Sequence, residues 1–151
     1  MEVNPYDPFV RTDLSANEKV MMSFMTNCMH GDDLSLIDTL VAKDYIQHTP
    51  GIGQGREGLR SYLTTIAHVR PGRKIWRPIQ IFAVGDMVIL HKLIAQATIA
   101  DFVRFNSDGQ MAEHWDVVQL MPEPDYDPMR PSTENLSRFR ELFKIPNINL
   151  R

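Results

Sequence analysis

The first part of the chain has the hydrophobic spacing of helices. Ser15 and Glu18 stand three residues apart, which is the spacing of a capping box, where two side chains satisfy backbone N–H groups reciprocally. The helix that they open carries its apolar residues on one face: Val20, Met21, Phe24, Met25 and Cys28. Gly31 follows as its predicted stop.

Two more helices are predicted before Pro71. Asp32 or Asp33 caps the second helix. Its inward face is apolar: Leu34, Ile37, Leu40 and Val41. The third helix also has one apolar face: Leu59, Tyr62, Leu63 and Ile66. Between the two, residues 44–50 are expected to form a short extended segment that ends at Pro50.

After Pro71 the spacing changes from helical to alternating. Four strands are predicted, over residues 74–84, 87–100, 101–106 and 111–121. The tight-turn dipeptides at 85–86 and 108–109 join neighbouring strands as antiparallel hairpins. Three helices followed by a meander of strands predict an α+β fold, in which the helices lie on one face of an antiparallel sheet.

The same pattern divides the chain into three parts. Residues 1–14 are predicted to be an N-terminal arm, and residues 15–121 to be the domain built around the sheet. Residues 122–151 begin with a proline-containing linker, which is no central strand because proline lacks a backbone donor. Ser132 or Thr133 then caps an extra C-terminal helix.

Composition narrows the class of protein. The 151 residues are 43% hydrophobic and 23% charged, which is ordinary for one globular domain, and the net charge of −3 argues against a nucleic-acid partner. No apolar run approaches the ~20 residues of a membrane span, and the first residues lack the basic and apolar regions of an export signal. Cys28 is the single cysteine, so no intrachain disulfide is expected. Together these features predict a cytoplasmic protein that has no membrane partner.

The last predicted strand carries the clearest candidate chemistry. Alternation places His114 and Asp116 together on an apolar face, and Trp115 on the opposite face, where packing or an interface explains it. Desolvation disfavours the charged form of a carboxylate and moves it toward the range of acid–base catalysis, and a neighbouring imidazole orients it or shares its proton. The alternative is a satisfied polar contact at a sheet edge, which catalyses nothing.

Two further histidines fall near this strand in the predicted fold. His91 alternates with Lys92, so we expect Lys92 to face solvent or an interface and His91 to face the core or a pocket. His48 lies just before Pro50, where the chain is expected to reach the open end of the sheet. These histidines lack the compact spacing of metal ligands, so no metal is predicted.

Parts of the sequence resemble a known family. Residues 101–119, with the box Glu-His-Trp-Asp at 113–116, resemble the C-terminal hairpin of SnoaL-like proteins. Residues 45–50 resemble a second signature of that family, and His91 matches a frequent strand histidine. The likeness covers roughly residues 15–121. It extends to the superfamily of nuclear transport factor two, scytalone dehydratase and ketosteroid isomerase.

The resemblance implies a reaction and its residues. The named members are polyketide cyclases, which close a ring by aldol condensation without metal or cofactor. An acid–base enzyme of the aldol or isomerase type, acting on a small hydrophobic carbonyl compound, is therefore implied. Asp116 is then the base and His114 its partner, while His48 and His91 donate hydrogen bonds to the enolate oxygen.

The resemblance also implies a strongly curved antiparallel sheet closed by three N-terminal helices, with a pocket and an assembly. We expect four further residues in the pocket: Tyr45, Gln47, Trp115 and Val118. A homodimer is expected through the outer face of the sheet, which bears Trp115, Val117 and Gln119. The alternative function is a non-catalytic ligand-binding or dimerisation module, since one fold hosts many activities.

Overall fold

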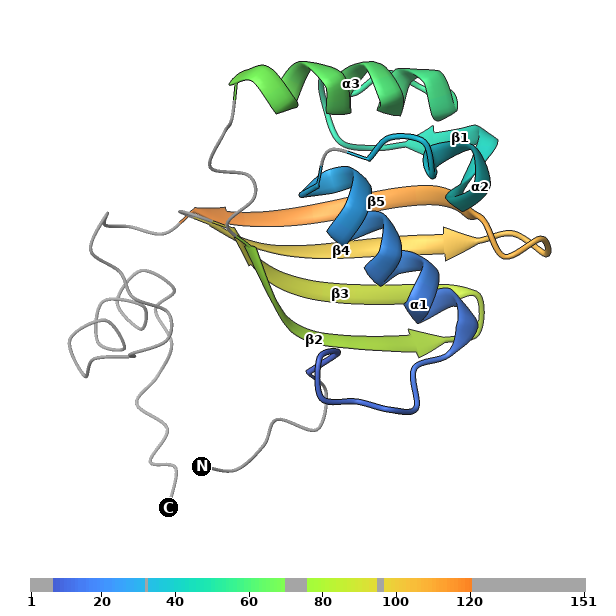
Figure 1. Ribbon diagram of the computed structural model, residues 1–151, viewed down its shortest axis with the longest axis vertical. Coiled ribbons are helices and arrows are strands. Elements are labelled where there is room, and N and C mark those ends of the chain that lie inside the picture. Colours follow the sequence, from blue (N-terminus) through green and yellow to red (C-terminus); the bar gives the residue numbers. More distant parts are fainter. Residues whose placement is uncertain (1–6, 32, 70–75, 95–96, 121–151) are drawn as a thin grey trace. The chain divides into compact units, whose positions relative to one another are not determined.

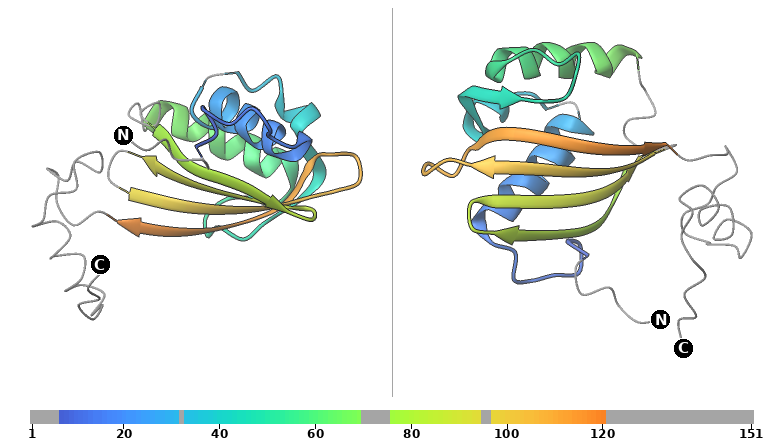
Figure 2. Two further views of the ribbon diagram at one scale, coloured as in Figure 1. Left: turned by 90° about the horizontal axis from the view of Figure 1, so that it is seen from below. Right: turned by 180° about the vertical axis from the view of Figure 1, so that it is seen from behind.

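Five strands form one curved sheet, and the helices pack on one of its faces (Figures 1 and 2). The computed structural model describes residues 7–31, 33–69, 76–94 and 97–120, without the side chains of 67–69, and all of them belong to the unit Met1–Leu120. The strand order is β1-β5-β4-β3-β2, so β1 and β2 form the two edges and the sheet is not closed into a barrel. The α+β class is confirmed.

Three hairpins connect four of the strands, which are β2 (Trp76–Val84), β3 (Met87–Ile94), β4 (Ala97–Phe105) and β5 (Met111–Leu120). The two predicted glycine turns are confirmed, with φ of 60° at Gly85 and 74° at Gly109, values that glycine adopts without steric cost.

The middle hairpin differs from the sequence prediction. Ile94 pairs with Ala97, so β4 begins four residues before the predicted strand start at residue 101. The predicted strand boundaries 87–100 and 101–106 are therefore wrong. Residues 95–96 lie outside the described residues, and neither is a glycine, proline, aspartate or asparagine, the residues that ordinarily signal a turn in a sequence. The correction places Asp101 in the middle of a strand.

The edge strand β1 (Val41–Gln47) pairs with β5 in parallel, so the sheet is mixed and not purely antiparallel as predicted. Ile46 pairs with Glu113 and Gln47 with His114, but the register shifts between Val41 and Ile46. Such an irregularity interrupts the alternation of side chains. The sequence pattern therefore shows only part of this strand.

The first helix begins as predicted and then widens. The backbone N–H of Ser15 donates to Glu18 Oε2 at 2.8 Å, and that of Glu18 donates to Ser15 Oγ at 3.3 Å, which confirms the capping box of α1 (Ala16–Ser23). The helix continues as a π-helix, η1 (Phe24–Met29), which the sequence did not predict. A π-helical turn displaces the following side chains relative to an α-helix, and such turns are frequent at functional sites.

The other helices match the prediction unevenly. The second is a single turn, α2 (Ile37–Leu40), because Val41 already belongs to β1, so the predicted longer helix is wrong. The third is α3 (Gly55–Val69), with Leu59, Leu63 and Ile66 buried as expected. The extra C-terminal helix and the linker at 122–151 lie outside the described residues.

The core lies between the helices and one face of the sheet. α1 packs against β2 and β3, and α3 packs against β1. α3 approaches the preceding loop so closely that a Cβ on Gly58 would lie 2.3 Å from the carbonyl carbon of Gly53. No helix within residues 7–120, as far as these are described, is long and apolar enough to cross a membrane.

Candidate functional site

A cavity of about 500 Å³ lies between the inner face of the sheet and the helices. η1 and α3 contribute mainly apolar side chains to its wall, including Phe24, Met25 and Leu59. The strands contribute most of the polar side chains: Tyr45, Gln47, Lys92, Asp101, His114 and Asp116. A mostly apolar cavity with a few convergent polar groups is the usual form of a small-molecule site.

A buried ion pair lies on the wall. Lys92 Nζ is 2.8 Å from Asp101 Oδ2, and the two side chains are 3% and 4% exposed. The contact lacks the geometry of a hydrogen bond at Oδ2, so it is an ion pair held by charge. Burial alone raises the pKa of Asp101, but Lys92 and His114 more than offset this effect and hold the pKa below its ordinary value. Asp101 is therefore ionised.

His114 is held from both sides of its ring. Its Nδ1 lies 2.9 Å from Gln47 Oε1, and its Nε2 lies 3.2 Å from Asp101 Oδ1. The backbone N–H of Thr49 donates to the same Gln47 oxygen at 3.0 Å, which fixes the orientation of that amide. Both ring nitrogens thus face acceptors, and an imidazole donates to two acceptors only when it carries both protons. The arrangement therefore fits a cationic His114.

Gln47 is itself locked in place. Its backbone N–H donates to Gln54 Oε1 at 2.9 Å, and Gln54 Nε2 donates to the Gln47 carbonyl oxygen at 2.6 Å. The amide of Gln54 thereby pairs with the end of β1 as a neighbouring strand would. This support fixes the side chain that orients His114.

Asp116 differs from Asp101 although the two lie opposite each other on β5 and β4. It is half-buried on the cavity wall, and its side chain makes no hydrogen bond or ion pair with any residue that the structure describes. Carboxylate and imidazole atoms of Asp101, His114 and Asp116 lie within 4.8 Å of one another. Asp101 is therefore already paired with Lys92 and His114, whereas the carboxylate of Asp116 is available to a ligand.

Tyr45 adds a neutral donor. Its side chain lines the cavity and is 2% exposed. Burial raises the pKa of its hydroxyl, and the nearby charges of Asp101 and Asp116 raise it further. The hydroxyl therefore keeps its proton and can donate it in a hydrogen bond.

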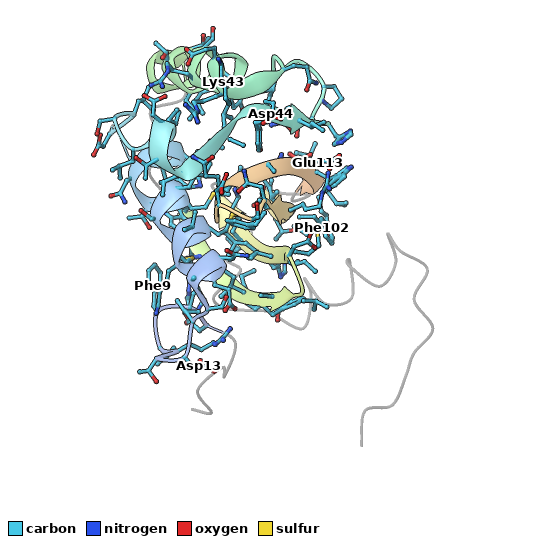
Figure 3. All side chains as sticks on the ribbon, turned by 90° about the vertical axis from the view of Figure 1, so that its right-hand side faces the viewer. Phe9, Asp13, Lys43, Asp44, Phe102 and Glu113 are labelled. Atoms are coloured by element: carbon cyan, nitrogen blue, oxygen red, sulfur yellow. The ribbon has the colours of Figure 1, made fainter. Side chains whose placement is uncertain are left out.

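Of the eight predicted site residues, four lie on the cavity wall: Tyr45, Gln47, His114 and Asp116. His48 and Trp115 lie on the outer face, where their rings stack at 4.8 Å with an interplanar angle of 4°. His48 Nε2 also lies 2.8 Å from Glu113 Oε1. Figure 3 shows Glu113 and Phe102 pointing away from α1.

His91 and Val118 also lie off the cavity wall. The orientation expected for β3 is reversed, because Lys92 faces inward and His91 faces outward. Burial lowers the pKa of His91 all the same. Val118 is 50% exposed. The placement of His48, His91, Trp115 and Val118 around the pocket is therefore corrected.

The polar residues of the wall that the sequence did not predict include His30, Lys92 and Asp101. Lys92 was assigned to the outside because a mid-strand lysine ordinarily faces water, but both faces of β3 are apolar and alternation alone cannot orient it. The sequence predicts Asp101 at a strand end, because no turn signal lies between Ile94 and Ala97. The π-helical turn that precedes His30 leaves no sequence pattern.

Asp101, His114 and Asp116 are close enough to share a metal ion. The donor set fits this poorly, since Lys92 already neutralises Asp101 and both nitrogens of His114 face acceptors. A metal would have to displace a buried ammonium. The absence of a metal therefore stays a prediction.

Comparison with known proteins gives fold relatives only. No family profile and no curated protein matches the sequence. Among solved structures, a candidate isomerase of the SnoaL-like family from Agrobacterium tumefaciens has a TM-score of 0.59 at 13% identity, with 70% of this chain and 99% of that chain covered. A candidate polyketide cyclase from Bacillus cereus has a TM-score of 0.53 at 19% identity, with coverage of 68% and 72%.

An NTF-2-like protein of unknown function from Burkholderia xenovorans has a TM-score of 0.56 at 18% identity, with 76% of this chain and 90% of that chain covered. The chain therefore has the fold of the SnoaL-like, NTF-2-like proteins.

Proposed function

We propose that the cavity catalyses cofactor-independent proton transfer at a carbon next to the carbonyl group of a small, mostly apolar compound. The observation that carries this proposal is Asp116, an available carboxylate in a mostly apolar cavity beside a doubly hydrogen-bonded His114. Positioned carboxylates act as general bases when a substrate proton lies within hydrogen-bond reach.

In the proposed step, Asp116 takes the α-proton. The electron pair of the C–H bond becomes the C=C bond of an enolate, and the carbonyl π electrons move to oxygen. Return of the proton to another carbon completes an isomerisation, and attack of the enolate carbon on a second carbonyl completes an aldol reaction. The names of two fold relatives, a candidate isomerase and a candidate cyclase, are compatible with both outcomes.

The supporting residues have separate roles in this proposal. His114 cannot donate to the substrate, since both of its nitrogens already face Gln47 and Asp101. It acts as a fixed positive charge beside the developing anion. The hydroxyl of Tyr45 is a neutral donor for the substrate oxygen. We no longer assign that role to His48 and His91, which do not reach the cavity.

The second candidate is a non-catalytic module that binds ligands or assembles through the sheet. It is favoured by exposed apolar side chains on the sheet: Ile46 at 43%, Val84 at 69% and Val117 at 65%. The outer face has no helix over it within the described residues (Figure 2). Exposed apolar side chains on a sheet face that no helix covers favour an interface, so we propose a homodimer for either function.

Exchange of α-protons separates the two candidates. 2-Indanone in D₂O exchanges its α-protons slowly in buffer, and ¹H NMR follows the loss of their signal. The proposed enzyme should accelerate this exchange in proportion to protein concentration, with saturation as the cavity fills. Indane, which lacks the carbonyl, should compete. Binding of 2-indanone without accelerated exchange would reject proton transfer and leave the binding module.

A further inference from the structure

Lys92 is a buried cation that the proposed proton transfer leaves without a role. Its side chain is 3% exposed and borders the cavity from the inner face of β3. Desolvating an ammonium is costly, and replacing a buried ion pair by apolar residues often leaves a fold equally stable or more stable. The Lys92–Asp101 pair is therefore poorly explained as a device for stability.

The ammonium keeps a donor for a ligand. It carries three N–H groups. One donates to Met25 Sδ at 3.3 Å. The ion pair with Asp101 at 2.8 Å lacks hydrogen-bond geometry, so the other two N–H groups have no hydrogen-bond acceptor among the residues that the structure describes. The thioether of Met25 is a weak acceptor, so a ligand oxygen competes with it easily.

Lys92 also lies at the right place relative to Asp116. Lys92 on β3 pairs with Ile99 on β4, and Asp116 on β5 pairs with Asp101 on β4. Ile99 and Asp101 are two residues apart, which is about 7 Å along the strand. Lys92 Nζ contacts Asp101, and the Asp101 carboxylate is in turn within 4.8 Å of Asp116. A carbonyl compound whose α-carbon meets Asp116 and whose oxygen meets Lys92 spans this gap.

We propose that Lys92 is the oxyanion-binding residue of the cavity, and that the site selects compounds that carry or develop a negative oxygen, such as enolates and phenolates. This inference deepens the proposed function and rests on it for its catalytic part. Before proton transfer the negative charge is on Asp116, and afterwards it is on the substrate oxygen beside Lys92. Asp116 is then a neutral acid, so the total charge of the cavity is unchanged.

Phenolate binding tests the proposal without the natural substrate. Asp116→Asn stands for the protonated base and removes its repulsion. This variant should bind 4-nitrophenol as the phenolate, seen by absorbance at a pH below the ionisation midpoint of the compound in water. Adding Lys92→Met should weaken phenolate binding about 10- to 100-fold, the usual effect of losing a charged hydrogen bond. Binding of 4-nitrotoluene, its neutral isostere, should change less than about threefold.

Two controls keep the test decisive. Lys43→Met makes the same substitution at an exposed lysine of β1 and should leave phenolate binding unchanged. Lys92→Met leaves Asp101 short of a partner, so Lys92→Met is also made together with Asp101→Asn, and the loss of phenolate preference should persist. A folded variant without Lys92 that still prefers the phenolate would overturn the proposal. Lys92-dependent phenolate binding without exchange of 2-indanone would keep the oxyanion site and reject the proton transfer.

Discussion

Asp101→Asn tests whether the buried charges hold the site together. The carboxylate lies 2.8 Å from Lys92 Nζ and 3.2 Å from His114 Nε2, and it is 4% exposed. Removing one partner of a buried ion pair leaves an uncompensated charge and costs about 3–5 kcal/mol. That exceeds the ~1 kcal/mol of a typical substitution. Urea unfolding at pH 7 should therefore show the free energy of unfolding lowered by about 3–5 kcal/mol.

The pH dependence gives this prediction a second check. The pKa of Asp101 is lowered in the folded protein, because Lys92 and His114 outweigh the effect of burial. Its stabilising contribution is then complete above the ordinary carboxyl pKa of 3.8 and is lost as the pH falls through the lower folded value. Asparagine does not titrate. The stability difference between wild type and variant should narrow as the pH falls below about 4.

Asp38→Asn serves as the control, since Asp38 is 62% exposed and pairs with Arg60 at 2.8 Å. An exposed pair contributes about 0–1 kcal/mol, so this variant should unfold almost as the wild type does. An Asp101→Asn variant that loses less than about 1 kcal/mol at pH 7 would refute the reasoning. A difference that stays constant on acidification would refute it as well.

Three further predictions concern the assembly, the metal and the corrected histidines. Sedimentation at micromolar concentration should find a homodimer that Val117→Glu weakens, and a wild-type monomer would contradict the proposed interface. Elemental analysis of protein purified without added metal should find no stoichiometric zinc or iron, and finding either would overturn the metal-free account. His48→Ala and His91→Ala should each change the exchange of 2-indanone less than about threefold, because neither side chain reaches the cavity, whereas a loss of ~10²-fold would restore them as catalytic residues.

The sequence predicts most of the fold because local signals mark it well. The capping box of Ser15 and Glu18 begins α1, and Gly85 and Gly109 mark two hairpins by their positive φ. The parallel strand β1 is harder to predict, because its irregular register interrupts the alternation. The boundary between β3 and β4 is also hard to predict, because none of the usual turn residues lies between Ile94 and Ala97. Both errors have the same physical origin, since long-range pairing determines these segments and local preference does not.

The site is predictable only in part, for a related reason. Alternation correctly places His114 and Asp116 on one face of β5, and both reach the cavity wall. It cannot decide which face of β3 is the inner one, because apolar residues occupy both faces. Lys92 was therefore expected outside and His91 inside. The burial of Lys92 is explained by its ion pair with Asp101. Asp101 lies on β4, and the sequence predicts the start of that strand at the wrong residue.

The exchange rate of Asp116→Asn tests the central claim most directly. The substitution preserves the shape of the side chain and removes the proposed base, and the described residues offer Asp116 no hydrogen bond or ion pair that the change would break. If Asp116 is the base, the rate of α-proton exchange in 2-indanone should fall by ~10²–10⁴, while the melting temperature and the affinity for the ketone change little. An unchanged exchange rate together with a lowered melting temperature would show that Asp116 is structural and would contradict the account.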